Sequence, residues 1–237
     1  MTTNTGNLVR VGNVEIPLAT AVGWVRSYTN EARNTTSPRP YAYPAYDRFD
    51  RDGNDPGRLT DADLLAPGLL NVPVKIRTFY DLQRIRPVLE DVLRNPELER
   101  PLDDLDAATV SATMAPLYAV LDDPKTKPWN ANATTLSKVL HRKRPRVLVL
   151  HDRWVRECYV GDSGPVPKVN DRSWADYMTA ISTAIGHDIR TQRSAFEALD
   201  SATSNPGELT PVRLLDILAW MSRGKTPSEA AATTDPT

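Results

Sequence analysis

The residues best suited to chemistry are concentrated between positions 136 and 158, in the stretch LSKVLHRKRPRVLVLHDRWVREC. Within 138–156 the only acidic residue is Asp152, and the basic residues are Lys138, Arg142, Lys143, Arg144, Arg146, Arg153 and Arg156. If these side chains share a surface, they neutralise phosphates and give salt-sensitive, sequence-independent nucleic-acid binding. We therefore predict that nucleic acid, as DNA, is bound by Lys138, Arg142, Lys143, Arg144, Arg146 and Arg153.

The same basic run has a simpler interpretation. An acidic region extends from Asp91 to Asp123, and charge runs are usually solvated or paired within their own molecule. The alternative hypothesis is therefore a non-enzymatic interaction module, whose basic and acidic regions bind each other or a partner protein.

Asp152 is the candidate catalytic residue. It follows the apolar run 147–150 and opens an amphipathic segment, where a carboxylate caps a helix by accepting backbone N–H bonds. A carboxylate in this position could instead face a cleft, where it would stabilise a developing cation or activate water. Both interpretations remain open at this stage.

Metal and cofactor motifs are absent from the sequence. His141 and His151 lie ten residues apart beside Asp152, but the sequence has no HExxH motif and no paired CxxC motifs that would complete a metal site. Nor does it contain a glycine-rich phosphate loop, a dinucleotide fingerprint or a nucleophile elbow. We expect no metal and no cofactor, and we assign no chemical role to the single cysteine, Cys158.

Composition restricts the class of protein. The chain has 237 residues, of which 40% are hydrophobic and 25% charged, as is ordinary for a globular domain. Its formal net charge of −1 gives no long-range attraction to nucleic acid or to anionic membranes, so any such attraction must be local. The single cysteine fits a reducing compartment, and no apolar run is long enough to cross a membrane. We expect a cytoplasmic protein without a membrane partner.

The spacing of apolar residues predicts an all-α fold. We expect one compact helical domain over residues 1–224, with a short hairpin at 8–16, a long loop at 34–58 and a disordered tail at 225–237. Pro87 and Pro116 are expected to kink or split their helices, and a break is expected near Gly186 in the helix that Ser173 caps.

The predicted loop is rich in aromatic residues and supports a third hypothesis. Its side chains Tyr41, Tyr43, Tyr46 and Phe49 could line the pocket of a small-molecule enzyme. The sequence indicates no substrate for such an enzyme.

Three blocks of sequence resemble an actinobacterial family of unknown function, DUF6308. They are LTDADLL at 59–65, LSKVLHRKRP at 136–145 continuing to Asp152, and LLDILAWM at 214–221. The family label carries no activity, so the resemblance implies a helical intracellular protein.

The passage from the helix at 136 to Asp152 is also similar to part of the helix-hairpin-helix DNA glycosylases. That resemblance implies a helical fold, a flipped base as substrate, and an aspartate at the head of a helix, here Asp152. The chain departs from the pattern in two places. Residues 129–132, WNAN, replace the Leu-Pro-Gly-x-Gly hairpin, and no lysine occurs at 132–134, although Lys138 lies a turn further on. The resemblance therefore implies at most a monofunctional glycosylase.

Overall fold

The structure is a computed structural model that describes residues 8–50 and 55–222. Its only sheet within these residues is the predicted hairpin, formed by β1 (Leu8–Val11) and β2 (Val14–Pro17). The strands pair antiparallel, with Val9 opposite Ile16 and both side chains buried. The remaining elements are helices, which confirms the predicted all-α class. The predicted tail at 225–237 lies outside the described residues.

The hairpin is fixed to the rest of the molecule at its turn. Gly12 has a positive φ of 62°, and a Cβ placed there would lie 2.1 Å from the carbonyl oxygen of Cys158. Its backbone N–H donates to Asp188 Oδ2 at 2.8 Å, and the N–H of Asn13 donates to the Cys158 carbonyl oxygen at 2.8 Å. Only glycine combines this conformation with so close an approach.

The first part of the chain forms short helices. They are α1 (Leu18–Tyr28), α2 (Glu31–Thr36), α3 (Ala45–Arg48) and α4 (Asp61–Leu65). The predicted loop at 34–58 is wrong in part, because α3 and the end of α2 lie within it. Thr60 and Asp63 form the reciprocal capping box of α4 that their spacing indicates. Within the loop, Tyr43 and Tyr46 are each 1% exposed and hold it to the core, whereas Phe49 is 39% exposed.

Neither proline splits its helix. The helices α5 (Ile76–Leu93) and α6 (Ala107–Ala119) run through Pro87 and Pro116 as single segments. A proline removes one backbone hydrogen bond, and the apolar residues packed on both sides of it hold the helix together. Three short 3-10 helices complete this region: η2 (Ala66–Leu70), η3 (Pro96–Glu99) and η4 (Leu102–Asp104).

The last part of the chain holds α7 (Ala133–Leu140), α8 (Arg153–Tyr159), α9 (Trp174–Thr191), α10 (Arg193–Ser201) and α11 (Pro211–Ser222). The predicted break near Gly186 is wrong, because the chain turns instead at Gln192, which has the non-helical dihedral angles −133° and 30°. Gly186 stays inside α9, where a Cβ would lie 3.1 Å from the carbonyl oxygen of Leu102. The glycine thus permits close packing and does not break the helix.

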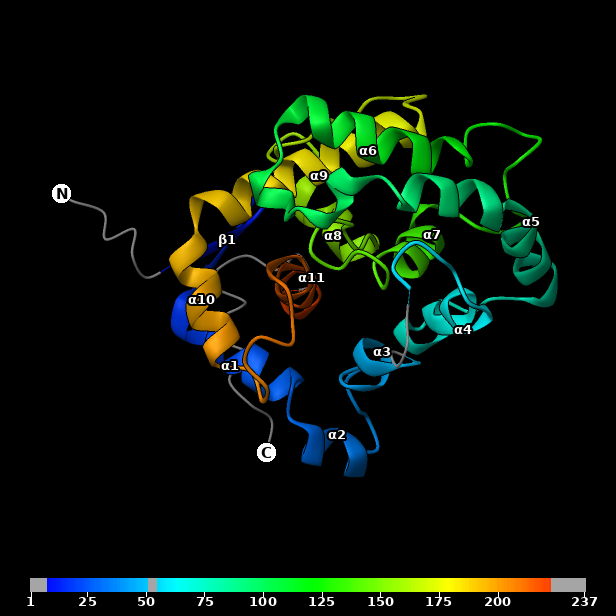
Figure 1. Ribbon diagram of the computed structural model, residues 1–237. Coiled ribbons are helices and arrows are strands. Elements are labelled where there is room, and N and C mark those ends of the chain that lie inside the picture. The colour runs from blue at the N-terminus through cyan, green and yellow to red at the C-terminus, as the bar shows by residue number, and fades with distance from the viewer. Residues whose placement is uncertain (1–7, 51–54, 223–237) are drawn as a thin grey trace.

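Helix α11 forms the centre of the molecule and supports α8. It lies in the middle of the view in Figure 1, with α1 and α10 on one side and α8 and α9 on another. Its residues 212–219 are all buried, and each large apolar side chain there contributes roughly 1.5–3 kcal/mol by leaving water. One hydrophobic cluster extends from Val9 in the hairpin to Ala219 in α11. No helix among the described residues has the length and apolar character needed to cross a membrane.

Candidate functional site

The side chains in the middle of the basic run point into the protein interior. Lys143 is 3% exposed, and its Nζ lies 2.5 Å from Oδ2 of Asp63. Arg142 Nε donates to the other oxygen of Asp63 at 3.0 Å and its Nη1 to the Tyr46 carbonyl oxygen at 2.9 Å. Burial alone would raise the pKa of the Asp63 carboxyl, but hydrogen bonds from Lys143 and Thr60 bring it below its ordinary value. Asp63 therefore stays charged and forms ion pairs with both cations.

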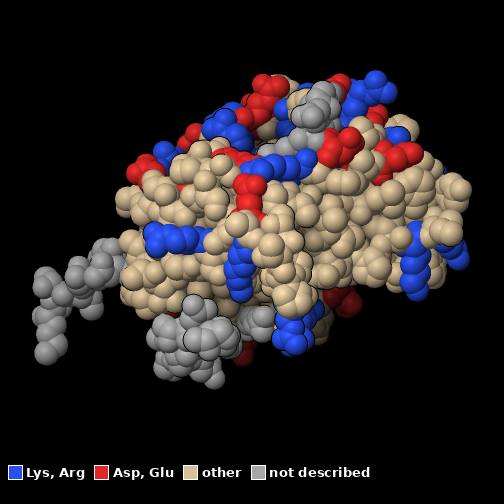
Figure 2. All heavy atoms as spheres, turned by 90° about the horizontal axis from the view of Figure 1, so that it is seen from below, with Lys and Arg blue, Asp and Glu red and all other residues tan. Residues whose placement is uncertain are grey.

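The flanks of the basic run point to different places. Arg144 Nη2 donates to the carbonyl oxygen of Leu93 at 2.8 Å, at the end of α5. Its guanidinium lies 3.8 Å from Glu99, the one residue of the acidic region that pairs with the run among the described residues. Arg146 is exposed and lines a separate cavity with Asp103. The six predicted side chains therefore do not form one continuous basic surface. On the face shown in Figure 2, basic side chains are likewise scattered among acidic and uncharged ones.

Asp152 caps α8, as one of its two interpretations predicted. Its Oδ1 accepts the backbone N–H groups of Trp154 at 2.8 Å and Val155 at 3.1 Å. Its Oδ2 lies 3.8 Å from the Nζ of Lys138, which is 2% exposed. No described residue donates a hydrogen bond to Oδ2, so this oxygen can accept one from a ligand. The catalytic role of Asp152 stays a prediction.

Two cavities meet at Asp152, and we call them the outer and the inner cavity. The outer cavity has a volume of about 680 Å³ and lies between α8, the segment 167–172 and the start of α9. The inner cavity has a volume of about 400 Å³ and lies between α8, α11 and the loop around Tyr41. Both are lined by Thr134, Asp152 and Arg153, so the two cavities are adjacent.

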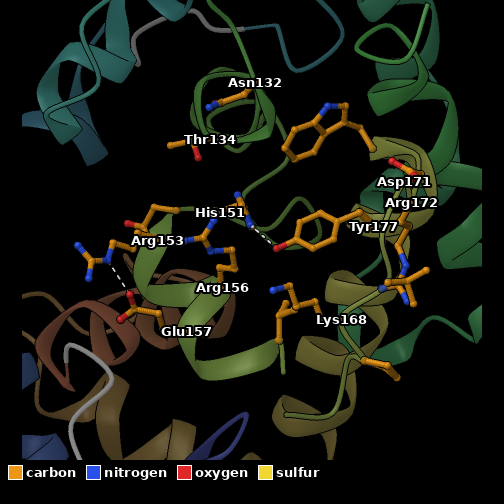
Figure 3. Close-up of a pocket in the computed structure, with 15 residues that line it drawn as sticks. Asn132, Thr134, His151, Arg153, Arg156, Glu157, Lys168, Asp171, Arg172 and Tyr177 are labelled. Atoms are coloured by element: carbon orange, nitrogen blue, oxygen red, sulfur yellow. Dashed lines mark hydrogen bonds and ion pairs between the residues drawn. The ribbon is translucent and has the colours of Figure 1, made fainter. Parts of the chain in front are cut away.

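A histidine and a tyrosine form the polar floor of the outer cavity. His151 Nε2 lies 2.9 Å from the hydroxyl of Tyr177, as Figure 3 shows. Burial lowers the pKa of His151 to about 4, so the imidazole is neutral near pH 7. Burial also raises the pKa of the Tyr177 hydroxyl to about 12. The Nδ1 atom of His151 is buried and has no hydrogen-bond partner among the described residues.

Three cations surround this floor. Arg156 comes from α8, and Lys168 and Arg172 come from the segment leading into α9 (Figure 3). The charges of Arg156 and Arg172 both act on the pKa of Tyr177, lowering it against the effect of burial. Within the described residues, none of these three cations has an ion-pair partner, whereas Arg153 pairs with Glu157 at 2.6 Å. The outer cavity thus has a small excess of positive charge, because Asp152, Glu157 and Asp171 also line it.

The inner cavity combines aromatic walls with buried charges. Trp154 lines it from α8, while Trp220 and Tyr41 meet edge-to-face with ring centroids 5.8 Å apart. Among the four aromatic side chains of the predicted loop, only Tyr41 lines this cavity. The charged residues are Lys138, Asp152, Arg153, Arg213 and Asp216.

Arg213 organises the polar side of the inner cavity. It is 2% exposed, and its Nε donates to Asp47 Oδ1 at 2.8 Å. A second guanidinium nitrogen donates to Asp216 Oδ2, and a third donates to the hydroxyl of Tyr28 at 3.0 Å. Burial raises the pKa of Asp216 against the attraction of Arg213. This network fixes the position of Asp216 at the cavity wall.

The histidines and the cysteine do not assemble into a metal site. His141 Nδ1 lies 2.6 Å from the carbonyl oxygen of Leu148, well placed for a structural hydrogen bond. Among the described residues, no three potential metal-ligating side chains lie together. Burial raises the pKa of the Cys158 thiol to about 11, which suits a packing role.

The residues singled out from the sequence include Lys138, Asp152 and Arg153, which line the outer or the inner cavity. Most of the other lining residues were missed. Lys168, Arg172 and Tyr177 surround His151, although they lie outside the basic run. The only signal in the sequence is a pair of basic residues in KVNDR, just before the helix that Ser173 caps.

Comparison with known proteins shows a family and no activity. The sequence profile of a family of unknown function, DUF6308, matches residues 21–223. No curated protein and no solved structure matches the chain significantly. The DNA glycosylase resemblance therefore gains no support, whereas the resemblance of the three blocks at 59–65, 136–152 and 214–221 is confirmed. The chain belongs to DUF6308, a family of unknown function.

Proposed function

We propose that this protein binds nucleic acid in the outer and inner cavities that meet at Asp152, with phosphates in the outer cavity. One observation carries the proposal. Arg156, Lys168 and Arg172 surround the outer cavity without an ion-pair partner in the described chain, directly beside a cavity with aromatic walls. Cations beside aromatic rings are the combination that single-stranded nucleic acids require, since the first bind phosphates and the second stack on bases.

The charge balance of the outer cavity favours a polyanion. Its lining holds four basic and three acidic side chains, and the three basic ones without an ion-pair partner in the described chain gain a counter-charge when a phosphate binds. The neutral His151 and the hydroxyl of Tyr177 can add hydrogen bonds without adding negative charge. A strand that contacts all three cations should bind with a salt slope of about −2, the value for three phosphate contacts on single-stranded nucleic acid.

The experiment is a titration of labelled single-stranded DNA, single-stranded RNA and duplex DNA by fluorescence anisotropy. It is repeated between about 50 and 200 mM salt. Arg156→Glu, Lys168→Glu and Arg172→Glu should each weaken binding and reduce the magnitude of the salt slope by about 1.

Arg26→Glu is the matched control, because Arg26 is exposed on α1, lines neither cavity and undergoes the same change of charge. It should leave binding unchanged. If all four variants bind alike, the cavity is not the binding surface. No binding even at low salt would instead favour the competing hypothesis of a protein-interaction module.

A further inference from the structure

We infer that the inner cavity takes one planar heteroaromatic ring that carries hydrogen-bond donors and acceptors along one edge. The inference deepens the proposed function and rests on it for the source of the ring, which would be a base of the bound strand. A free nucleoside presents the same chemistry, and the experiment below separates the two sources.

The walls of the inner cavity favour a flat ring. Tyr41 stacks on Tyr28 with centroids 5.0 Å apart, and Trp220 meets both rings edge-on, so this wall is a rigid aromatic unit. Trp154 lines the cavity from α8. Arg33 lies 4.7 Å over the Tyr41 ring and Arg153 lies 5.0 Å over the Trp154 ring. A ligand ring would therefore stack on the other face of Trp154, where it gains roughly 1–3 kcal/mol, largely independent of which base it is.

The polar side of the cavity selects a ring with a mixed edge. The Nζ of Lys138 is a donor, and the Oδ2 of Asp152, 3.8 Å away, is an acceptor that no described residue satisfies. Asp216 adds a second carboxylate, of which only Oδ2 is engaged by Arg213 in the described structure. A hydrocarbon ring would displace water from these groups without offering them a hydrogen bond, at a cost of about 1–3 kcal/mol for each group left unsatisfied. A heteroaromatic ring with adjacent donors and acceptors satisfies them.

The size and position of the cavity agree with a ring joined to a phosphate. A volume of about 400 Å³ lies at the low end for ligand pockets and has room for one ring system. The outer cavity, which shares Thr134, Asp152 and Arg153 with it, provides room for the rest of the ligand. A ligand of ring, sugar and phosphate would have its ring in the inner cavity and its phosphate in the outer one, on the two sides of Asp152.

The test compares a short single strand with its fully abasic counterpart of equal length. Both carry the same phosphates, so the ratio of their dissociation constants measures the contribution of the bases. The Trp154 variants then show whether this contribution comes from the inner cavity. The wild-type protein should bind the base-bearing strand about tenfold more tightly, as stacking of one base predicts. Trp154→Leu should bring the ratio close to one without changing the affinity for the abasic strand, while Trp154→Phe should retain most of the preference.

Trp129→Leu is the control, because Trp129 is 40% exposed and lines neither cavity. Circular dichroism of each variant verifies its fold, and the wild-type ratio tests the inference even if Trp154→Leu does not fold. A wild-type ratio of one would overturn the inference and leave strand binding intact.

Free adenosine and cytidine, followed by tryptophan fluorescence, form the second arm. Nucleoside binding that Trp154→Leu abolishes, without any strand binding, would support the inner cavity and contradict the proposed function. If neither strand nor nucleoside binds, both ideas fail.

Discussion

The middle of the basic run, Arg142 and Lys143, and the cations of the outer cavity show opposite relations between local sequence and ion pairing. The run has the highest density of positive charge in the sequence, yet Arg142 and Lys143 both pair with Asp63 inside the protein. Lys168 and Arg172 stand among neutral and acidic residues, yet within the described residues they have no ion-pair partner. Charge density along a chain therefore does not locate a charged surface, because the neutralising partner can come from a distant segment.

The two regions also use their charges differently. In the run, two cations and one carboxylate satisfy each other and hold α4 against the segment after α7. Around the outer cavity, unpaired cations raise the electrostatic energy of the empty protein and lower it when an anion binds. The first arrangement should matter for stability and the second for binding.

The largest expected effect concerns the run. Asp63→Ala removes the carboxylate that Arg142 and Lys143 share and half of the α4 capping box, so two buried cations lose this counter-charge. We expect a loss of about 3–5 kcal/mol in the free energy of unfolding, measured by urea denaturation. Asp61→Ala is the control: its ion pair with Arg86 joins a 58% exposed carboxylate, so it should cost less than about 1 kcal/mol. Equal losses for the two variants would contradict the burial argument.

The next effect concerns the floor of the outer cavity and depends on pH. The pKa of His151 is about 4 in the folded protein and about 6.5 in the unfolded chain, so the unfolded state takes up the proton first as the pH falls. Stability should be complete above about pH 6.5 and decline toward pH 4, by up to about 3 kcal/mol.

His151→Gln, which can still bond to Tyr177, should reduce this pH dependence in denaturation experiments between those values. His187→Gln provides the matched control, since His187 is exposed on α9. An unchanged pH dependence in His151→Gln would show that His151 is not the group that is protonated.

A smaller effect separates the two oxygens of Asp152. Asp152→Ala removes the α8 cap and should cost about 1 kcal/mol, whereas Asp152→Asn retains an acceptor and should cost much less. Asp152→Asn should therefore fold normally, so it tests the role of the second side-chain oxygen, Oδ2, without loss of the cap. If the carboxylate is catalytic, this variant loses any base-release activity while it still binds the strand. A folded Asp152→Asn variant with full activity would exclude the catalytic role.

The smallest effect is expected at Arg153, which belongs both to the basic run and to the cavity wall. Its side chain is 69% exposed and pairs with Glu157 one turn later. Arg153→Ala should therefore change stability by less than about 0.5 kcal/mol, as judged by thermal denaturation. A loss above about 1 kcal/mol would place Arg153 with the buried cations of the run.

Local features were predictable from the sequence and distant contacts were not. The hairpin at 8–17, the capping box at Thr60 and the cap at Asp152 follow from a few adjacent residues, and the structure confirms them. The break at Gln192 was missed because tight packing of Gly186 against Leu102 keeps α9 continuous. The pairing of Asp63 with Lys143 was invisible because the two residues meet only once the chain has folded. The walls of both cavities depend on the same kind of distant contact.

The turn of the hairpin at Gly12 has a mechanical consequence for the far end of α8. This helix has 7 residues, so it is about 10 Å long, with the hairpin bound to its last turn and the cavities at its first. A short, straight helix transmits displacement along its axis without bending. A side chain introduced at Gly12 would displace the carbonyl group of Cys158, and α8 would transmit this displacement to Asp152. A substitution in the hairpin turn should therefore change the affinity of the cavities for a ligand.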